Sequence, residues 1–90
     1  MFENLEYIIK TIRERKNLLS SNSYTTKLLN DKNLSTSKVK EEISELIEAI
    51  EKDSNKIHEA ADVIYHLMVY LEAHDVKIED VMSELKKRQK

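Results

Sequence analysis

The chain has 90 residues and contains neither glycine nor proline, which is the strongest constraint on what it can fold into. Glycine supplies the backbone conformations of tight β-hairpin turns, and glycine-rich loops bind phosphate in P-loop and dinucleotide-binding folds. The sequence therefore excludes both loop motifs and argues against a β-rich protein. Asparagine, aspartate and serine must provide the turns instead, and they cluster at 20–23, 30–37, 53–55 and 74–75.

Between these clusters, apolar residues recur with the period of a helix. The spacing predicts helices at about 2–19, 36–52, 55–73 and 77–89, with a short helical turn at 24–30. We therefore predict an all-α fold, a helical bundle of four to five helices that forms a single domain over residues 1–90. The apolar residues predicted to face the core in the third and last helices are Val39, Ile43, Leu46, Ile47, Ile50, Ile78, Val81, Met82 and Leu85.

The size and charge of the chain limit its partners. A domain this small builds a modest core and has no cysteine for disulfides, so we expect a homodimer that completes the core. The net charge of −2 at pH 7 gives no general attraction to nucleic acid. No apolar run approaches the ~20 residues of a membrane span, and the first residues lack a signal-peptide pattern. We expect a cytoplasmic protein that binds neither nucleic acid nor membrane.

The predicted helix at 55–73 is apolar around most of its circumference, which is typical of a buried helix. One narrow polar stripe interrupts it and contains Glu59, Asp62 and His66. Ionised groups on a buried helix need partners, because unpaired burial of charge is costly. A solvated stripe is the simpler alternative, but the acidic spacing within the stripe favours a functional site.

Two acidic pairs with the same spacing lie on two predicted helices. Glu42 and Glu45 form the first pair, and Glu59 and Asp62 form the second. A three-residue spacing places both carboxylates on one side of a helix, where each pair at ~4 Å repels by roughly 1–4 kcal/mol. A divalent cation reverses that repulsion, and such oxygen ligands suit Mg²⁺, with Mn²⁺ as the alternative. Carboxylate-bound Mg²⁺ commonly binds substrate phosphates, so the pairs indicate nucleotide pyrophosphate chemistry.

Two other interpretations of the acidic residues compete with this one. Glutamate-rich helices produce single pairs by chance, and such charges are then merely solvated. A di-iron bundle needs two Glu-x-x-His motifs, whereas His58 precedes Glu59 and His66 follows Asp62 by four residues. Neither histidine fits the di-iron pattern.

The residues around the acidic pairs form three longer motifs. They are Ser23-Tyr24-Thr25 followed by Lys27-Leu28-Leu29, Lys38-Val39-x-Glu41-Glu42 followed by Glu45, and Glu59-Ala60-Ala61-Asp62-Val63-Ile64-Tyr65-His66. Together with Arg15-Lys16 and Val81-x-x-x-Leu85, these motifs resemble the phosphoribosyl-ATP pyrophosphohydrolase family of the all-α, MazG-like superfamily. The chain departs from that family at Lys40, where the family usually has glycine.

The resemblance implies a role for each motif. It implies that Glu42, Glu45, Glu59 and Asp62 bind Mg²⁺, and that Arg15, Ser23, Tyr24, Thr25, Lys27, Lys38 and His66 bind substrate. It also suggests Glu41 as the group that accepts a proton from the attacking water. Simpler alternatives remain: an exposed Glu41, an ion pair of Lys38 with Glu42, and a helix cap at Ser23. For His66 there are two alternatives: it hydrogen-bonds a metal-binding carboxylate, or it is a core histidine whose hydrogen bonds are satisfied.

The resemblance further implies the reaction. It is the Mg²⁺-dependent hydrolysis of the α–β phosphoanhydride of phosphoribosyl-ATP to phosphoribosyl-AMP and pyrophosphate, the second step of histidine biosynthesis. One alternative is a house-cleaning (d)NTP pyrophosphohydrolase with the same chemistry. Another, of a different class, is a non-enzymatic helical module that uses the acidic stripe to bind a partner.

Overall fold

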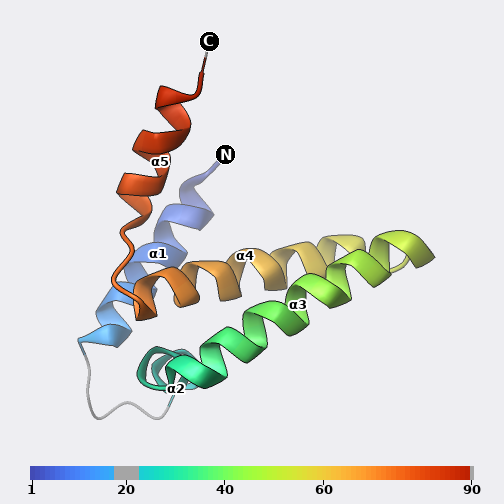
Figure 1. Ribbon diagram of the computed structural model, residues 1–90, viewed down its shortest axis with the longest axis horizontal. Helices are drawn as coiled ribbons and strands as arrows, with labels where there is room; N and C mark the ends of the chain where they lie inside the picture. The colour runs from blue at the N-terminus through green and yellow to red at the C-terminus, as the bar shows by residue number, and fades with distance from the viewer. Residues whose placement is uncertain (18–22, 90) are drawn as a thin grey trace.

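The computed structural model describes residues 1–17 and 23–89, and its regular elements there are all helices (Figure 1). The helices are α1 (Glu3–Lys16), α2 (Tyr24–Asn30), α3 (Lys32–Lys52), α4 (Lys56–Ala73) and α5 (Ile78–Lys87). The all-α prediction with four to five helices is confirmed. The predicted end of the first helix at 18–19 and most of the 20–23 cluster lie outside the described residues. No described helix is long and apolar enough to cross a membrane.

Aspartate and asparagine replace glycine in the turns. Asp53 and Asn55, with φ of 52° and 57°, form the turn between α3 and α4, and Asp75, with φ of 59°, follows α4. The left-handed region excludes most side chains, but Asp and Asn tolerate it because their short polar groups hydrogen-bond locally. The predicted breaks at 53–55 and 74–75 are confirmed for this reason.

The predicted break at 30–37 is too long, because α3 begins at Lys32. Asp31 alone starts the helix, its carboxylate accepting a hydrogen bond from the Leu34 N–H at 3.0 Å. The Thr36 hydroxyl then donates to the Lys32 carbonyl at 2.9 Å, which satisfies a polar side chain within the helix. Lys40 lies well inside α3 and is exposed, where lysine is a better helix former than glycine.

Helices α3 and α4 form a long antiparallel pair, and α1 and α5 project from it at the C-terminal end of α4 (Figure 1). The short helix α2 contacts α1, α3 and α4. The hydrophobic core lies where these helices meet and consists of Ile12, Leu28, Leu29, Val69 and Ala73. Leu28 and Val69 are fully buried.

Many residues predicted to face a core are exposed in the single chain. On α3, Val39 is buried, but Ile43, Ile47 and Ile50 are 43%, 54% and 59% exposed. On α5, Met82 and Leu85 are each 50% exposed, and on α4 the exposed apolar residues are Ile57, Ile64 and Leu67. One chain therefore leaves these stripes and part of α4 uncovered, because its described helices provide too few neighbours, and their burial stays a prediction for the homodimer.

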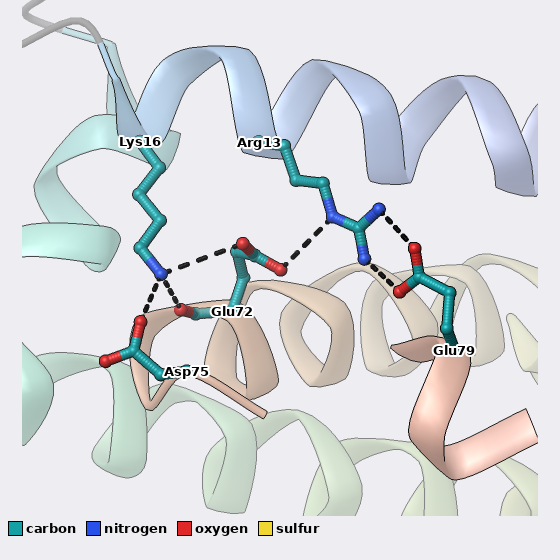
Figure 2. Close-up of polar contacts among 5 residues, drawn as sticks. All are labelled: Arg13, Lys16, Glu72, Asp75 and Glu79. Atoms are coloured by element: carbon teal, nitrogen blue, oxygen red, sulfur yellow. Dashed lines mark hydrogen bonds and ion pairs between the residues drawn. The ribbon is translucent and has the colours of Figure 1, made fainter. Parts of the chain in front are cut away.

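An ion-pair network joins α1 to the end of α4 and to α5 (Figure 2). The Arg13 guanidinium binds both carboxylate oxygens of Glu79, one at 2.7 Å, and Nε lies 3.5 Å from Glu72. Lys16 Nζ donates to the Glu72 carbonyl at 2.8 Å and to Asp75 at 2.6 Å, which caps the C-terminus of α4. The hydrogen bonds from Arg13 lower the pKa of Glu79 to about 2. The network therefore sets the position of α5.

Candidate metal and substrate site

The two acidic pairs meet between α3 and α4. Glu42 and Glu45 come from α3, and each places an oxygen within 4.8 Å of an oxygen of Glu59 from α4. By the same measure, Glu59 and Asp62 form a second group with His58. Because the helices are antiparallel and each pair occupies one side of its helix, packing brings together acidic residues that are 14 and 17 positions apart in sequence. Three of the four predicted carboxylates, Glu42, Glu45 and Glu59, thus meet in one group, and Asp62 lies beside Glu59 in the other.

The carboxylates destabilise one another's charge. Burial raises the pKa of Glu42, and the neighbouring charges of Glu45 and Asp62 raise it further. Burial also raises the pKa of Glu59, again with a contribution from Glu45. The pKa of a group rises in this way when its ionised form is poorly compensated. His66 and His58 act in the opposite direction, but they do not compensate the charge of these two carboxylates.

Two carboxylate oxygens at this site also lack a hydrogen-bond donor. Oε2 of Glu42 and Oε2 of Glu59 are shielded from solvent and have no partner in the described part of the chain. Buried oxygens normally have a partner, so each needs an explanation such as an ion. A divalent cation that prefers oxygen ligands fits both the donors and the missing charge. The residues present thus suit Mg²⁺ or Mn²⁺.

The Ser-Tyr-Thr segment lies against the second acidic helix. The Tyr24 hydroxyl lies 3.0 Å from His66 Nε2, and the Thr25 hydroxyl hydrogen-bonds that of Tyr65. His66 Nδ1 donates to the main-chain carbonyl of Asp62 at 2.8 Å, so in the neutral ring Nε2 accepts from Tyr24. Two adjacent residues of α2 thereby pair with two adjacent residues of α4.

His66 is buried, with both ring nitrogens hydrogen-bonded. It contacts the main chain of Asp62 rather than the carboxylate, so its geometry matches the alternative of a satisfied core histidine. The contact of Tyr65 with Thr25 was not predicted, because nothing in the sequence of one helix identifies a partner on another. The only signal was that Tyr24-Thr25 and Tyr65-His66 are both adjacent polar pairs.

Lys38 and Glu41 form an ion pair at the edge of the site, with Nζ 3.1 Å from the carboxylate. The hydrogen bond from Lys38 to Glu41 raises the pKa of Lys38. Burial raises the pKa of Tyr24, the charge of Lys38 opposes that rise, and Tyr65, Glu42 and Glu41 add to it. Lys38 therefore pairs with Glu41 rather than with Glu42, and both lie near the Tyr24 ring.

Three other predicted substrate-binding residues lie on α1 or at α2 rather than on the two acidic helices. The Ser23 hydroxyl caps α2 by accepting from the Thr26 N–H at 3.1 Å, as the simpler alternative predicts. Arg15 is half-buried on α1 and Lys27 is exposed on α2. Within residues 1–17 and 23–89, no hydrogen bond or ion pair joins Arg15 or Lys27 to the acidic groups.

Known proteins match the chain over nearly its full length. The family model described as phosphoribosyl-ATP pyrophosphohydrolase matches residues 5–89. Relatives named phosphoribosyl-ATP pyrophosphatase include one from Halobacterium salinarum, 37% identical over 98% of this chain and 99% of that protein. Another, from Neisseria meningitidis, is 44% identical over 94% of this chain and 82% of its own length. A third, from Roseobacter denitrificans, is 38% identical over 94% and 84% respectively.

The match covers all three motifs around the converging carboxylates. It includes the Ser-Tyr-Thr segment on α2, the acidic pair of α3 and the acidic pair of α4. The chain belongs to the phosphoribosyl-ATP pyrophosphohydrolase family.

Proposed function

We propose that this chain is a Mg²⁺-dependent hydrolase of phosphoribosyl-ATP. It cleaves the α–β phosphoanhydride and releases phosphoribosyl-AMP and pyrophosphate, the second step of histidine biosynthesis. The observation that carries the proposal is the convergence of carboxylates from α3 and α4, where two shielded oxygens have no donor among the residues that the structure describes. Family membership supports the substrate. We also propose that residues 1–90 form one domain and that the protein is cytoplasmic.

In the proposed site, Glu42, Glu45, Glu59 and Asp62 hold the cation. When bound, Mg²⁺ neutralises charge on the phosphate oxygens and stabilises the leaving pyrophosphate. Glu41 accepts a proton as a water oxygen bonds to the α-phosphorus and the α–β anhydride bond breaks. Lys38 pairs with Glu41 at the edge of the site. In the proposed complex Lys38 binds a phosphate oxygen instead, which leaves the Glu41 carboxylate available to accept the proton.

The Ser-Tyr-Thr segment holds the nucleotide in this proposal. The hydroxyls of Ser23, Tyr24 and Thr25 suit phosphate and ribose oxygens, and Arg15 and Lys27 add positive charge. His66 contributes to substrate binding by orienting Tyr24, since its Nε2 faces that hydroxyl at 3.0 Å. The hydrogen bonds between α2 and α4 support this arrangement because they couple the nucleotide segment to the metal-binding helix.

The assay that tests the function measures pyrophosphate release from phosphoribosyl-ATP and from a panel of dNTPs, with Mg²⁺ and with EDTA. We expect release from phosphoribosyl-ATP that stops when EDTA removes the metal, because the site lacks positive charge of its own. Faster turnover of dNTPs would assign the chain to house-cleaning hydrolysis. No release from any nucleotide, with no stabilisation by millimolar Mg²⁺ or Mn²⁺, would favour the interaction module.

We also propose that the chain works as a homodimer. Its accessible surface is 6951 Å², whereas a compact monomer of this mass exposes about 5,500 Å². Its radius of gyration is 14.1 Å, against about 12 Å for a compact domain of this length. The exposed stripe of Ile43, Ile47 and Ile50 lies on one side of α3 at helical spacing. A second copy that covers this stripe explains the excess area.

The dimer predicts a specific effect of Ile47→Glu. A carboxylate placed in an apolar interface loses its hydration, so we expect the dissociation constant to rise at least about 100-fold. Sedimentation velocity over a range of protein concentrations measures this change. Ser37→Glu puts the same charge at another exposed position of α3 and is expected to leave the dimer intact. A wild-type chain that sediments as a monomer throughout would contradict the proposal.

A further inference from the structure

His58 has no role in the proposed reaction, yet it contacts the acidic site. It lies in the first turn of α4, one residue before Glu59 and four before Asp62. Its Nε2 lies 3.3 Å from the Asp62 carboxylate, and its side chain is 73% exposed. Core packing therefore does not explain its position, and its solvent-facing ring lies beside the carboxylates, where a bound cation would replace the contact with Asp62.

The spacing of these residues suits chelation by one helix. Residues four apart lie on adjacent turns of one face, and two ligands at this spacing bind zinc in the His-Glu-x-x-His motif. Here the sequence is His58-Glu59-Ala60-Ala61-Asp62, with aspartate in place of the second histidine. Ligand atoms of His58, Glu59 and Asp62 all lie within 4.8 Å of one another.

Glu59 and Asp62 have little positive charge around them in the described part of the chain. Oε2 of Glu59 is shielded and has no hydrogen-bond partner within the described residues. The nearby cation, Lys56, pairs with Asp53 instead. Among residues 1–17 and 23–89, no lysine or arginine forms an ion pair with Glu59 or Asp62. The imidazole of His58 is thus the basic group that lies beside both carboxylates.

Glu59 belongs to two groups with different donor atoms. The group with Glu42 and Glu45 offers only carboxylate oxygens, whereas the group with His58 and Asp62 also offers an imidazole nitrogen. Mg²⁺ prefers oxygen ligands, while Mn²⁺, Co²⁺ and Zn²⁺ also accept imidazole. The two groups therefore differ in the ions that they favour.

We infer that His58, Glu59 and Asp62 form a second cation position, beside the all-carboxylate one, that selects transition-metal ions over Mg²⁺. The inference rests on the proposed metal-binding function, because Glu59 and Asp62 also belong to that site. In this second position, the His58 imidazole adds a nitrogen ligand that makes the chain discriminate between metal ions.

The test compares Co²⁺ and Mg²⁺ binding to the full chain without a purification tag, by calorimetry and by visible absorption of Co²⁺. The chain has no cysteine, so its Co²⁺ spectrum reports nitrogen and oxygen ligands alone. His58→Gln is expected to weaken Co²⁺ binding at least about tenfold and to change Mg²⁺ binding less than about twofold, since only Co²⁺ gains from imidazole. His74→Gln, at the other exposed histidine, is the matched control.

A second measurement locates the ion directly. Substoichiometric Co²⁺ is expected to shift or broaden the ring signals of His58 in NMR spectra and to leave those of His74 unchanged. Unaltered Co²⁺ affinity in His58→Gln, an equal loss of Co²⁺ and Mg²⁺ affinity, or an unaffected His58 signal would each overturn the inference. Pyrophosphate release with Mg²⁺ tests the proposed function separately, so failure of one is distinguishable from failure of the other.

Discussion

Glu59→Gln is expected to lower Mg²⁺-dependent pyrophosphate release by at least about 100-fold, the upper end of the loss caused by changing a residue that only supports a metal ligand. Glu59 is the carboxylate that both groups of candidate ligands share. Glutamine keeps the shape of the side chain but removes the charge that compensates the cation. Steady-state assays at saturating substrate measure the loss, and circular dichroism checks that the helices remain.

Glu84→Gln is the matched control for this substitution. Glu84 is an exposed residue of α5 that pairs with Arg88, and α5 carries none of the four candidate metal-binding carboxylates. The same change of chemistry there is expected to leave turnover within about twofold of the wild type, because exposed pairs contribute little. Full activity of Glu59→Gln would refute the metal site.

Glu59→Gln is also expected to change how the stability of the metal-free chain depends on pH. The raised pKa of Glu59 means that the folded chain binds this proton more tightly than the unfolded chain does. The metal-free wild type therefore loses stability as pH rises from the ordinary glutamate pKa through the raised value, and regains it in acid. Glu59→Gln removes this penalty, so at pH 7 its metal-free melting temperature is expected to exceed that of the wild type. Adding Mg²⁺ is expected to reverse the order, since only the wild type binds it well.

Leu28→Ala is expected to lower the free energy of unfolding by about 2–5 kcal/mol, the usual range for a large-to-small change in a core. Leu28 is fully buried in the cluster that joins α1, α2 and α4. Stability of small domains is only about 5–15 kcal/mol, so this loss is a large part of the total. Urea unfolding at a fixed protein concentration measures it.

Leu28→Ala is also expected to affect substrate binding, because the helix that contains Leu28 carries Tyr24 and Thr25. A cavity beneath α2 is expected to loosen the hydrogen bonds of these residues to α4 and to raise the KM for phosphoribosyl-ATP. Asn30→Ala, at the exposed end of the same helix, is expected to change stability by less than about 0.5 kcal/mol. Equal stability of the two variants would show that α2 is not part of the core.

Local patterns in the sequence predicted the helices well. Four of the predicted breaks involve Asp, Asn or Ser, and in the described chain the turns at Asp53, Asn55 and Asp75 use the left-handed conformation that glycine usually supplies. The start of α3 was misplaced because one aspartate, Asp31, is enough to begin a helix, and Thr36 satisfies its hydroxyl within it. Capping and turn preferences act over a few residues, so they can be recognised in the sequence.

The candidate site was predictable only in part. The spacing of each acidic pair follows from one helix, and the sequence therefore identifies the carboxylates. The pairing of Thr25 with Tyr65, of Lys38 with Glu41, and the contact of His58 with Asp62 each depend on rotamers or on a second helix. A helical period specifies the side of a helix on which a residue lies, but it does not identify the neighbour.

The sequence by itself determined an all-α chain with two equally spaced acidic pairs, because the helical period and the lack of glycine and proline act within each segment. Only the tertiary structure decided that Glu42, Glu45 and Glu59 meet, and that apolar stripes stay exposed. It also decided that one oxygen each of Glu42 and Glu59 has no donor within residues 1–17 and 23–89. These properties arise from how segments distant in sequence pack, and packing sets burial, repulsion and the need for a cation.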